Sequence, residues 1–114
     1  MAKSHVCMTV EWHVPAAETG PITAALHALM IATRTARGCV GCSVSTGVGN
    51  SGAVRYTEEW QTEEDLRMRL RSDTFTRLAS LIDDATKPPV VEFELPEGKR
   101  GLDFAEEIRN RRRT

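Results

Sequence analysis

The sequence predicts an α+β fold, the ferredoxin-like β-α-β-β-α-β order with a four-stranded antiparallel sheet. Two observations predict it. Apolar and polar residues alternate in four segments, which is the pattern of strands with one buried face. In the two regions that follow the first and third of these segments, apolar residues recur every three or four positions, which is the pattern of helices that cover a sheet. At 114 residues the chain has the size of one domain.

The four strands are expected over residues 6–14, 39–48, 53–61 and 90–95. Pro15 ends the first strand because proline cannot donate a hydrogen bond to the sheet. Residues 49–52, Gly-Asn-Ser-Gly, are typical of a turn, so the second and third strands form a hairpin. Alternation assigns to the buried face Val6, Met8, Val10, Trp12, Val14, Val40, Cys42, Val44, Val54, Tyr56, Glu58, Trp60, Val91, Phe93 and Leu95.

The helices are expected between these strands. The first begins near Pro21, since proline suits a first turn, and ends before Gly38, which suits the left-handed conformation after a helix. The second begins after Thr62, which with Asp65 three residues on resembles a capping box. It restarts at Ser72 and ends before two consecutive prolines.

Residues 1–96 are expected to form this domain, and residues 97–114 a charged C-terminal tail. The tail contains one short apolar stripe, which predicts a short helix docking on a partner subunit. The stripe consists of Leu102, Phe104, Ala105 and Ile108.

Composition excludes several classes of partner. The net charge of −1 argues against a nucleic-acid-binding domain. No apolar run approaches the roughly 20 residues that a membrane span needs. Three cysteines and an N-terminus without a secretory pattern predict a cytoplasmic protein with reduced thiols.

A second copy of the chain is the expected partner. Helices on one side leave the other face of the sheet bare, and that face carries small and charged residues. Two such faces can pack together around a two-fold axis, which predicts a homodimer. A monomer with a solvated sheet face is the alternative.

The helix-covered face holds groups that suit a ligand pocket as well as a core. Trp60 and Trp12 can hold a flat ring, and Tyr56 and Glu58 can manage a proton, so Trp60, Tyr56 and Glu58 are the catalytic candidates. The remaining ligand-binding candidates are Trp12, Cys42, Met30, Arg69 and Phe75. Alternatively, Trp60 and Tyr56 are core residues.

Glu58 needs a partner or a proton on an apolar face. Its alternatives are an ion pair with Arg69, Arg34 or His27, or a role as acceptor of a substrate proton. The ion pair is favoured, because buried carboxylates usually have partners.

Cys39 and Cys42 form a C-x-x-C motif. In a strand, residues three apart point to opposite faces, and no second cysteine pair exists to complete four ligands. We therefore expect no metal site.

Three segments resemble the antibiotic biosynthesis monooxygenase family. They are ARGCVGC at residues 36–42, YTEEWQTEEDL at residues 56–66 and RSDTF at residues 71–75. Their order and spacing match over roughly residues 5 to 95. The resemblance implies the dimeric α/β barrel, in which the sheets of two ferredoxin-like subunits meet.

The resemblance also implies a function. Some members oxygenate quinol-like aromatic molecules without metal or flavin, with the substrate between sheet and helices. Others degrade haem, using an Asn on the first strand, a Trp at the end of the third and a His on the second helix. Here only Trp60 matches, since Trp12 and Ala79 hold the other two positions. We expect no cofactor, and either a monooxygenase acting on a small aromatic molecule or a non-catalytic dimer that binds a small apolar ligand.

Overall fold

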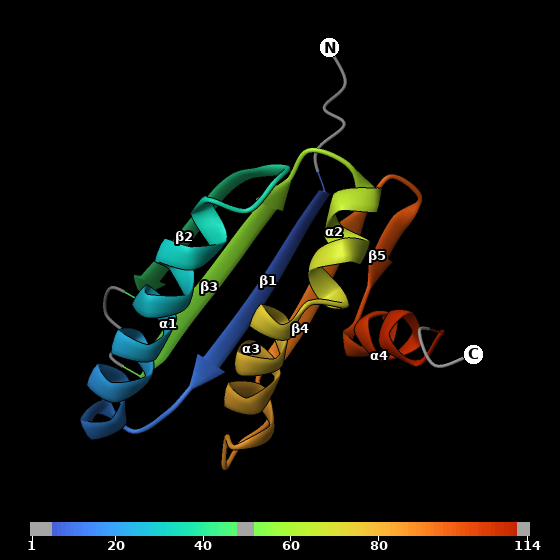
Figure 1. Ribbon diagram of the computed structural model, residues 1–114. Coiled ribbons are helices and arrows are strands. Elements are labelled where there is room, and N and C mark those ends of the chain that lie inside the picture. Colours follow the sequence, from blue (N-terminus) through green and yellow to red (C-terminus); the bar gives the residue numbers. More distant parts are fainter. Residues whose placement is uncertain (1–5, 48–51, 112–114) are drawn as a thin grey trace.

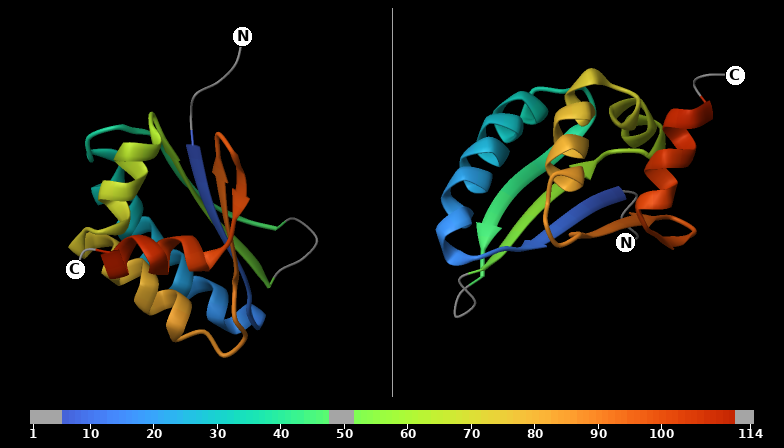
Figure 2. Two further views of the ribbon diagram at one scale, coloured as in Figure 1. Left: turned by 90° about the vertical axis from the view of Figure 1, so that its right-hand side faces the viewer. Right: turned by 90° about the horizontal axis from the view of Figure 1, so that it is seen from below.

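Five antiparallel strands form one sheet in the order β2-β3-β1-β4-β5, with the helices on one of its faces (Figures 1 and 2). The computed structural model describes residues 6–47 and 52–111. The strands are β1 (Val6–His13), β2 (Cys39–Thr46), β3 (Ala53–Trp60), β4 (Val90–Leu95) and β5 (Gly98–Arg100). The helices are the 3₁₀ turn η1 (Ala16–Glu18), α1 (Thr19–Arg34), α2 (Glu63–Leu70), α3 (Asp73–Asp83) and α4 (Leu102–Arg111).

The ferredoxin-like order predicted from the sequence is confirmed, with a fifth strand that the pattern did not predict. β5 has three residues, too few for alternation to be visible, and it pairs with β4. Gly98 has a φ of 137°, which a residue with a side chain rarely adopts. Residues 49–51 of the predicted turn lie outside the described residues, but the antiparallel pairing of β2 with β3 confirms the hairpin.

The start of β2 contains a β-bulge. Cys39 lies opposite Trp60 and Gly41 opposite Glu59, so Val40 is an extra residue without a partner position in β3. Val40 is 47% exposed, and its expected place on the buried face was wrong. The bulge also puts Cys39 and Cys42 on the same face, since the latter lies opposite Glu58, so the expectation of opposite faces was wrong too.

Polar caps mark the starts of α2 and α3, as the sequence predicted. The Thr62 hydroxyl accepts a hydrogen bond from the backbone N–H of Asp65 at 3.1 Å. The Ser72 hydroxyl accepts one from the N–H of Phe75 at 3.2 Å. Each cap satisfies a donor that a helix start would otherwise leave free.

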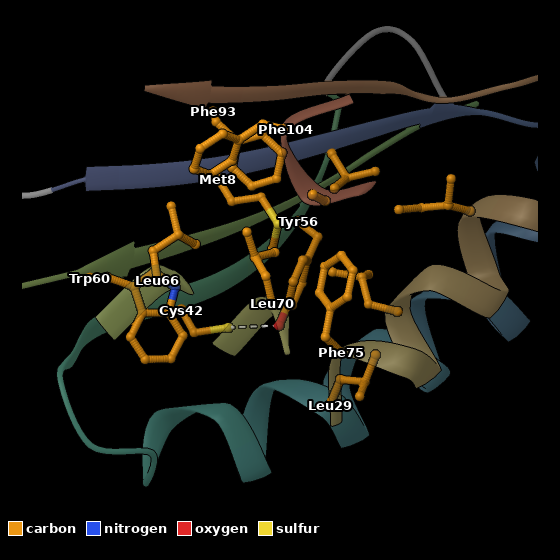
Figure 3. Packing of buried hydrophobic residues seen from close by; sticks show 14 of the residues in the cluster. Met8, Leu29, Cys42, Tyr56, Trp60, Leu66, Leu70, Phe75, Phe93 and Phe104 are labelled. Atoms are coloured by element: carbon orange, nitrogen blue, oxygen red, sulfur yellow. Dashed lines mark hydrogen bonds between the residues drawn. The ribbon is translucent and has the colours of Figure 1, made fainter. Parts of the chain in front are cut away.

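One core lies between the sheet and the helices (Figure 3). The alternation of β1 and β3 is confirmed, because every second side chain is buried from Val6 to Trp12 and from Val54 to Trp60. Within the described ranges, no helix is long and apolar enough to cross a membrane.

The predicted C-terminal helix is present as α4. Its residues Phe104, Ala105 and Ile108 are buried against their own chain, and the Phe104 and Phe93 rings lie 5.1 Å apart. Arg109 attaches the helix to the break between α2 and α3, donating to the carbonyl of Leu70 at 2.6 Å. A contact of the tail with a partner subunit stays a prediction.

Candidate functional site

A buried carboxylate, Glu58, occupies the centre of the helix-covered face of β3. Its side chain is 0% exposed, and both oxygens accept hydrogen bonds. The Tyr56 hydroxyl donates to Oε2 at 2.6 Å, and the Trp60 indole Nε1 donates to Oε1 at 3.0 Å. Alternation along one strand places these three side chains together, because residues two apart share a face.

Arg69 of α2 neutralises this carboxylate. Its guanidinium binds the Glu58 carboxylate side-on through two hydrogen bonds, with Nε 3.1 Å from Oε1 and Nη2 2.5 Å from Oε2. Nη2 also donates to the Thr33 hydroxyl of α1 at 3.1 Å. Burial tends to lower the pKa of Arg69, but the hydrogen bonds and charge of Glu58 outweigh burial and raise it, so the guanidinium stays charged.

Tyr56 connects this ion pair to β2. Its hydroxyl accepts from Cys42 Sγ at 3.3 Å and lies 3.4 Å from the Thr33 hydroxyl (Figure 3 draws the Cys42 contact). Burial, and then the negative charge of Glu58, raise the pKa of Tyr56 above its usual value. Tyr56 is therefore a phenol that holds its proton at neutral pH.

The same burial predicts a loss of stability in alkali. Burial raises the pKa of Cys42 from 9.0 to about 11 and also raises that of Tyr56 above 10.0, so both groups ionise more readily in the unfolded chain. Stability should be constant up to about pH 8, begin to fall near pH 9 and fall more steeply above pH 10, by up to about 1.4 kcal/mol per pH unit for each group.

Urea denaturation between pH 7 and pH 10.5 measures this loss. Cys42→Ala should reduce the slope from pH 9, and Tyr56→Phe the slope above pH 10. Equal free energies of unfolding at pH 8 and pH 10.5 would contradict the assignment of these groups to a sealed core.

A cleft of about 210 Å³ adjoins the buried network. It lies between the end of α1, helix α2 and the start of α3. Trp60 and Arg69 form its inner wall. Gly38 leaves room for the Asp65 carboxylate, because a Cβ at position 38 would collide with it. The lining residues are Ala32, Thr33, Ala36, Arg37, Trp60, Asp65, Met68, Arg69, Ser72 and Thr74.

The structure brings together five of the eight predicted site residues: Tyr56, Glu58, Trp60, Arg69 and Cys42. Of these five, Trp60 and Arg69 line the cleft. Among the alternatives for Glu58, the ion pair with Arg69 is the one that the structure contains.

The other three predicted residues do not line this cleft. Trp12 donates its indole N–H to the carbonyl of Leu81 at 3.4 Å and lines a second cavity of about 410 Å³ at the opposite end of the sheet. Met30 packs against the core, and Phe75 packs beneath the guanidinium of Arg109.

Sequence reasoning missed the polar groups that helices contribute to the cleft. Arg37, Asp65, Ser72 and Thr74 all lie at or just beyond helix ends. The sequence signals at Asp65 and Ser72 were their capping patterns, but these indicated helix boundaries rather than a site. Within the described residues, no group of three or more His, Cys, Asp or Glu side chains could hold a metal ion.

Comparison with known proteins agrees with this architecture. No curated protein matches the chain. Among solved structures, Rv0793 from Mycobacterium tuberculosis is 19% identical with a TM-score of 0.69, covering 82% of this chain and 95% of its own. A conserved protein from Methanosarcina mazei Go1 is 20% identical with a TM-score of 0.71, covering 80% and 91%.

A third solved structure, described as an antibiotic biosynthesis monooxygenase, is 18% identical with a TM-score of 0.65 and covers 77% of this chain and 94% of its own. Identities this low establish the fold alone. The sequence model of one family, antibiotic biosynthesis monooxygenase, matches residues 5–80, which is more than half of the chain. This protein therefore belongs to the antibiotic biosynthesis monooxygenase family.

Proposed function

We propose that this protein is a cofactor-independent monooxygenase that acts on a small aromatic, quinol-like molecule in the cleft beside Trp60. The observation that carries the proposal is the position of the cleft, which is walled by an immobilised indole and a buried arginine. Because the indole N–H is bound to Glu58, the carbon part of the ring is left to contact a ligand. Family membership supports oxygenation as the reaction.

In such a reaction the substrate supplies every electron. A ring CH₂ group loses a proton, its carbanion reduces dioxygen, and the group becomes a carbonyl. One oxygen atom enters the product and the other leaves as water. The protein's part is to orient the ring, to exclude water and to accept the first proton.

Asp65 is the proton acceptor that the geometry favours. It is the carboxylate among the residues that line the cleft. Glu58 is already bound by three donor side chains, which leaves it as a positioning residue for Arg69 and Trp60. Proton transfer by Glu58 or Tyr56 stays a prediction of the sequence.

Oxygen uptake tests the proposal. With anthrone as the probe, the protein should consume dioxygen faster than the protein-free solution and release the anthraquinone. Asp65→Asn should lower kcat about 100-fold or more, since general bases contribute that much. Trp60→Phe should raise KM, while Glu64→Gln, the matched change on the exposed side of α2, should alter neither.

Two results would contradict the proposal: no uptake above the protein-free rate, or equal rates in wild type, Asp65→Asn and Trp60→Phe. A non-catalytic ligand-binding protein is the second candidate. Tyr56 and Glu58, the two groups expected to transfer protons, are hydrogen-bonded to each other, and this contact favours the second candidate. That candidate predicts thermal stabilisation by anthrone without oxygen uptake.

We also propose that two copies pair through the open face of the sheet. One cross-strand row on that face consists of Ser43, Thr57, Thr9 and Glu92. Charged pairs such as Glu11 with Arg55, 2.8 Å apart, lie beside it, and Val90 is 63% exposed there. A row of three small polar side chains that ends in Glu92, with charged pairs beside it, suits an isologous interface.

A further inference from the structure

One hydrogen-bond donor of Arg69, Nη1, has no acceptor among the residues that the structure describes. Nε and Nη2 donate the two side-on hydrogen bonds to Glu58, so Nη1 lies on the opposite side of the guanidinium. Nη1 donates to no residue in the part of the chain that the structure describes, although Arg69 is only 5% exposed.

Nη1 is not sealed inside the protein. Among the described residues, Thr23 Oγ1 is the one buried side-chain nitrogen or oxygen that lacks both a hydrogen-bond partner and contact with solvent. Nη1 is not such an atom, so it keeps some contact with solvent, and Arg69 lines the cleft beside Trp60. Arg69 therefore brings to the wall of the cleft a guanidinium donor that no described residue accepts from, and such a donor can bind an acceptor on a ligand.

The surroundings of Nη1 select the acceptor. The ligand's ring would lie against Trp60 and Met68, so a single oxygen attached to that ring can reach the guanidinium. Guanidinium N–H groups bind anionic oxygens more strongly than neutral ones. The other charges that face this point are Arg37 and Asp65 in the cleft wall and Glu58 behind Arg69, and Tyr56 is neutral.

We propose that Arg69 binds an ionised ring oxygen, a phenolate or an enolate, and thereby holds the ligand of this cleft as its anion. The proposal rests on the function proposed above, because it places the substrate in the same cleft. It gives Arg69 a catalytic role, since the enolate of a quinol-like substrate is the form that transfers electrons to dioxygen. Asp65 takes the proton, and Arg69 stabilises the charge that remains.

A coloured phenol tests this role without any turnover. The probe is 4-nitrophenol, whose anion absorbs visible light, and its comparison compound is 4-nitroanisole, which has the same ring and no ionisable hydroxyl. The pKa of 4-nitrophenol should fall by about one unit or more when it is bound. The phenolate should bind about tenfold or more tightly than 4-nitroanisole, which is the selectivity that one charge-assisted hydrogen bond gives.

Variants assign the effect to Arg69. In Arg69→Lys the ammonium cannot hold Glu58 and a ligand together, so the shift in the dye's pKa should vanish. If that variant does not fold, Glu58→Gln/Arg69→Met removes both buried charges and serves the same purpose. Arg77→Lys makes the same substitution on the exposed face of α3, away from the cleft, and should leave the shift unchanged.

The outcomes separate the two proposals. The two tryptophan indole N–H signals in a ¹H–¹⁵N spectrum report binding, because Trp60 lines the cleft and Trp12 does not. If neither compound moves the Trp60 signal, the cleft is not a binding site and the proposed function fails. If both compounds move it equally and the dye's pKa is unchanged, the role of Arg69 is wrong while the cleft remains a ligand site.

Discussion

Replacing Arg69 with methionine should destabilise the fold by about 3–5 kcal/mol, because it would leave the charge of Glu58 buried without compensation. Glu58 is 0% exposed, and Arg69 supplies the one cation within hydrogen-bonding distance of it in the described structure. Urea denaturation at neutral pH measures the loss. Arg77→Met, which removes an exposed arginine from α3, is the matched control and should change stability by less than about 0.5 kcal/mol.

The double variant Glu58→Gln/Arg69→Met should recover most of that stability. It removes both buried charges, and the glutamine carbonyl still accepts a hydrogen bond from Trp60 or Tyr56. Glu58→Gln alone should also be destabilising, since it leaves the positive charge of Arg69 buried without a counter-charge. The three variants therefore form a double-mutant cycle with strong coupling. Additive losses, with the double variant the least stable of the three, would contradict a buried ion pair.

This cycle also connects stability with function. If the double variant folds well, the ion pair is not needed to form the core. The role that the ion pair then keeps is to position Arg69 at the wall of the cleft. The same double variant should lose the ionisation of bound 4-nitrophenol, so one protein tests both statements.

The alternation of β1, β3 and β4 made most of the fold predictable from the sequence. A period of two over eight residues has few other interpretations, and the caps at Thr62 and Ser72 marked the helices with the same clarity. The bulge at Val40 and the short strand β5 were not predictable in this way. Each depends on pairing between strands rather than on a repeating local pattern.

The candidate site was predictable in part. A glutamate on an apolar face favoured an ion pair, and the sequence provided three candidate partners, Arg69, Arg34 and His27. The choice of Arg69 depends on how α2 is rotated about its axis over β3. The packing of α2 and the break at Ser72 set this rotation, and the sequence pattern alone does not specify it. The cleft itself could not be predicted, because it is assembled from the end of α1 and from α2 and α3, which lie about 30 residues further along the chain and come together with α1 only in the fold.

The second large effect concerns the open face of the sheet. Thr57→Arg should convert the proposed dimer into a monomer, because it places a long charged side chain in the middle of the row Ser43, Thr57, Thr9 and Glu92. In a two-fold interface each substitution meets the partner twice, so one change introduces two buried like charges. Sedimentation velocity at micromolar concentration should show twice the monomer mass for wild type and the monomer mass for the variant.

A matched change on the helical side makes the result specific. Ser80→Arg adds the same side chain to an exposed position of α3, far from the open face, and should leave the dimer intact.

The Glu11 and Arg55 row lies on one side of the small residues, and Glu59 and Glu94 lie on the other. A two-fold axis along the middle row would bring Arg55 of each sheet toward Glu59 and Glu94 of the other sheet. Salt screens such attractions between opposite charges, so dissociation of the wild-type dimer should increase with salt. A monomeric wild type at these concentrations would remove the dimer from the proposal and leave the cleft beside Trp60 as a site within one subunit.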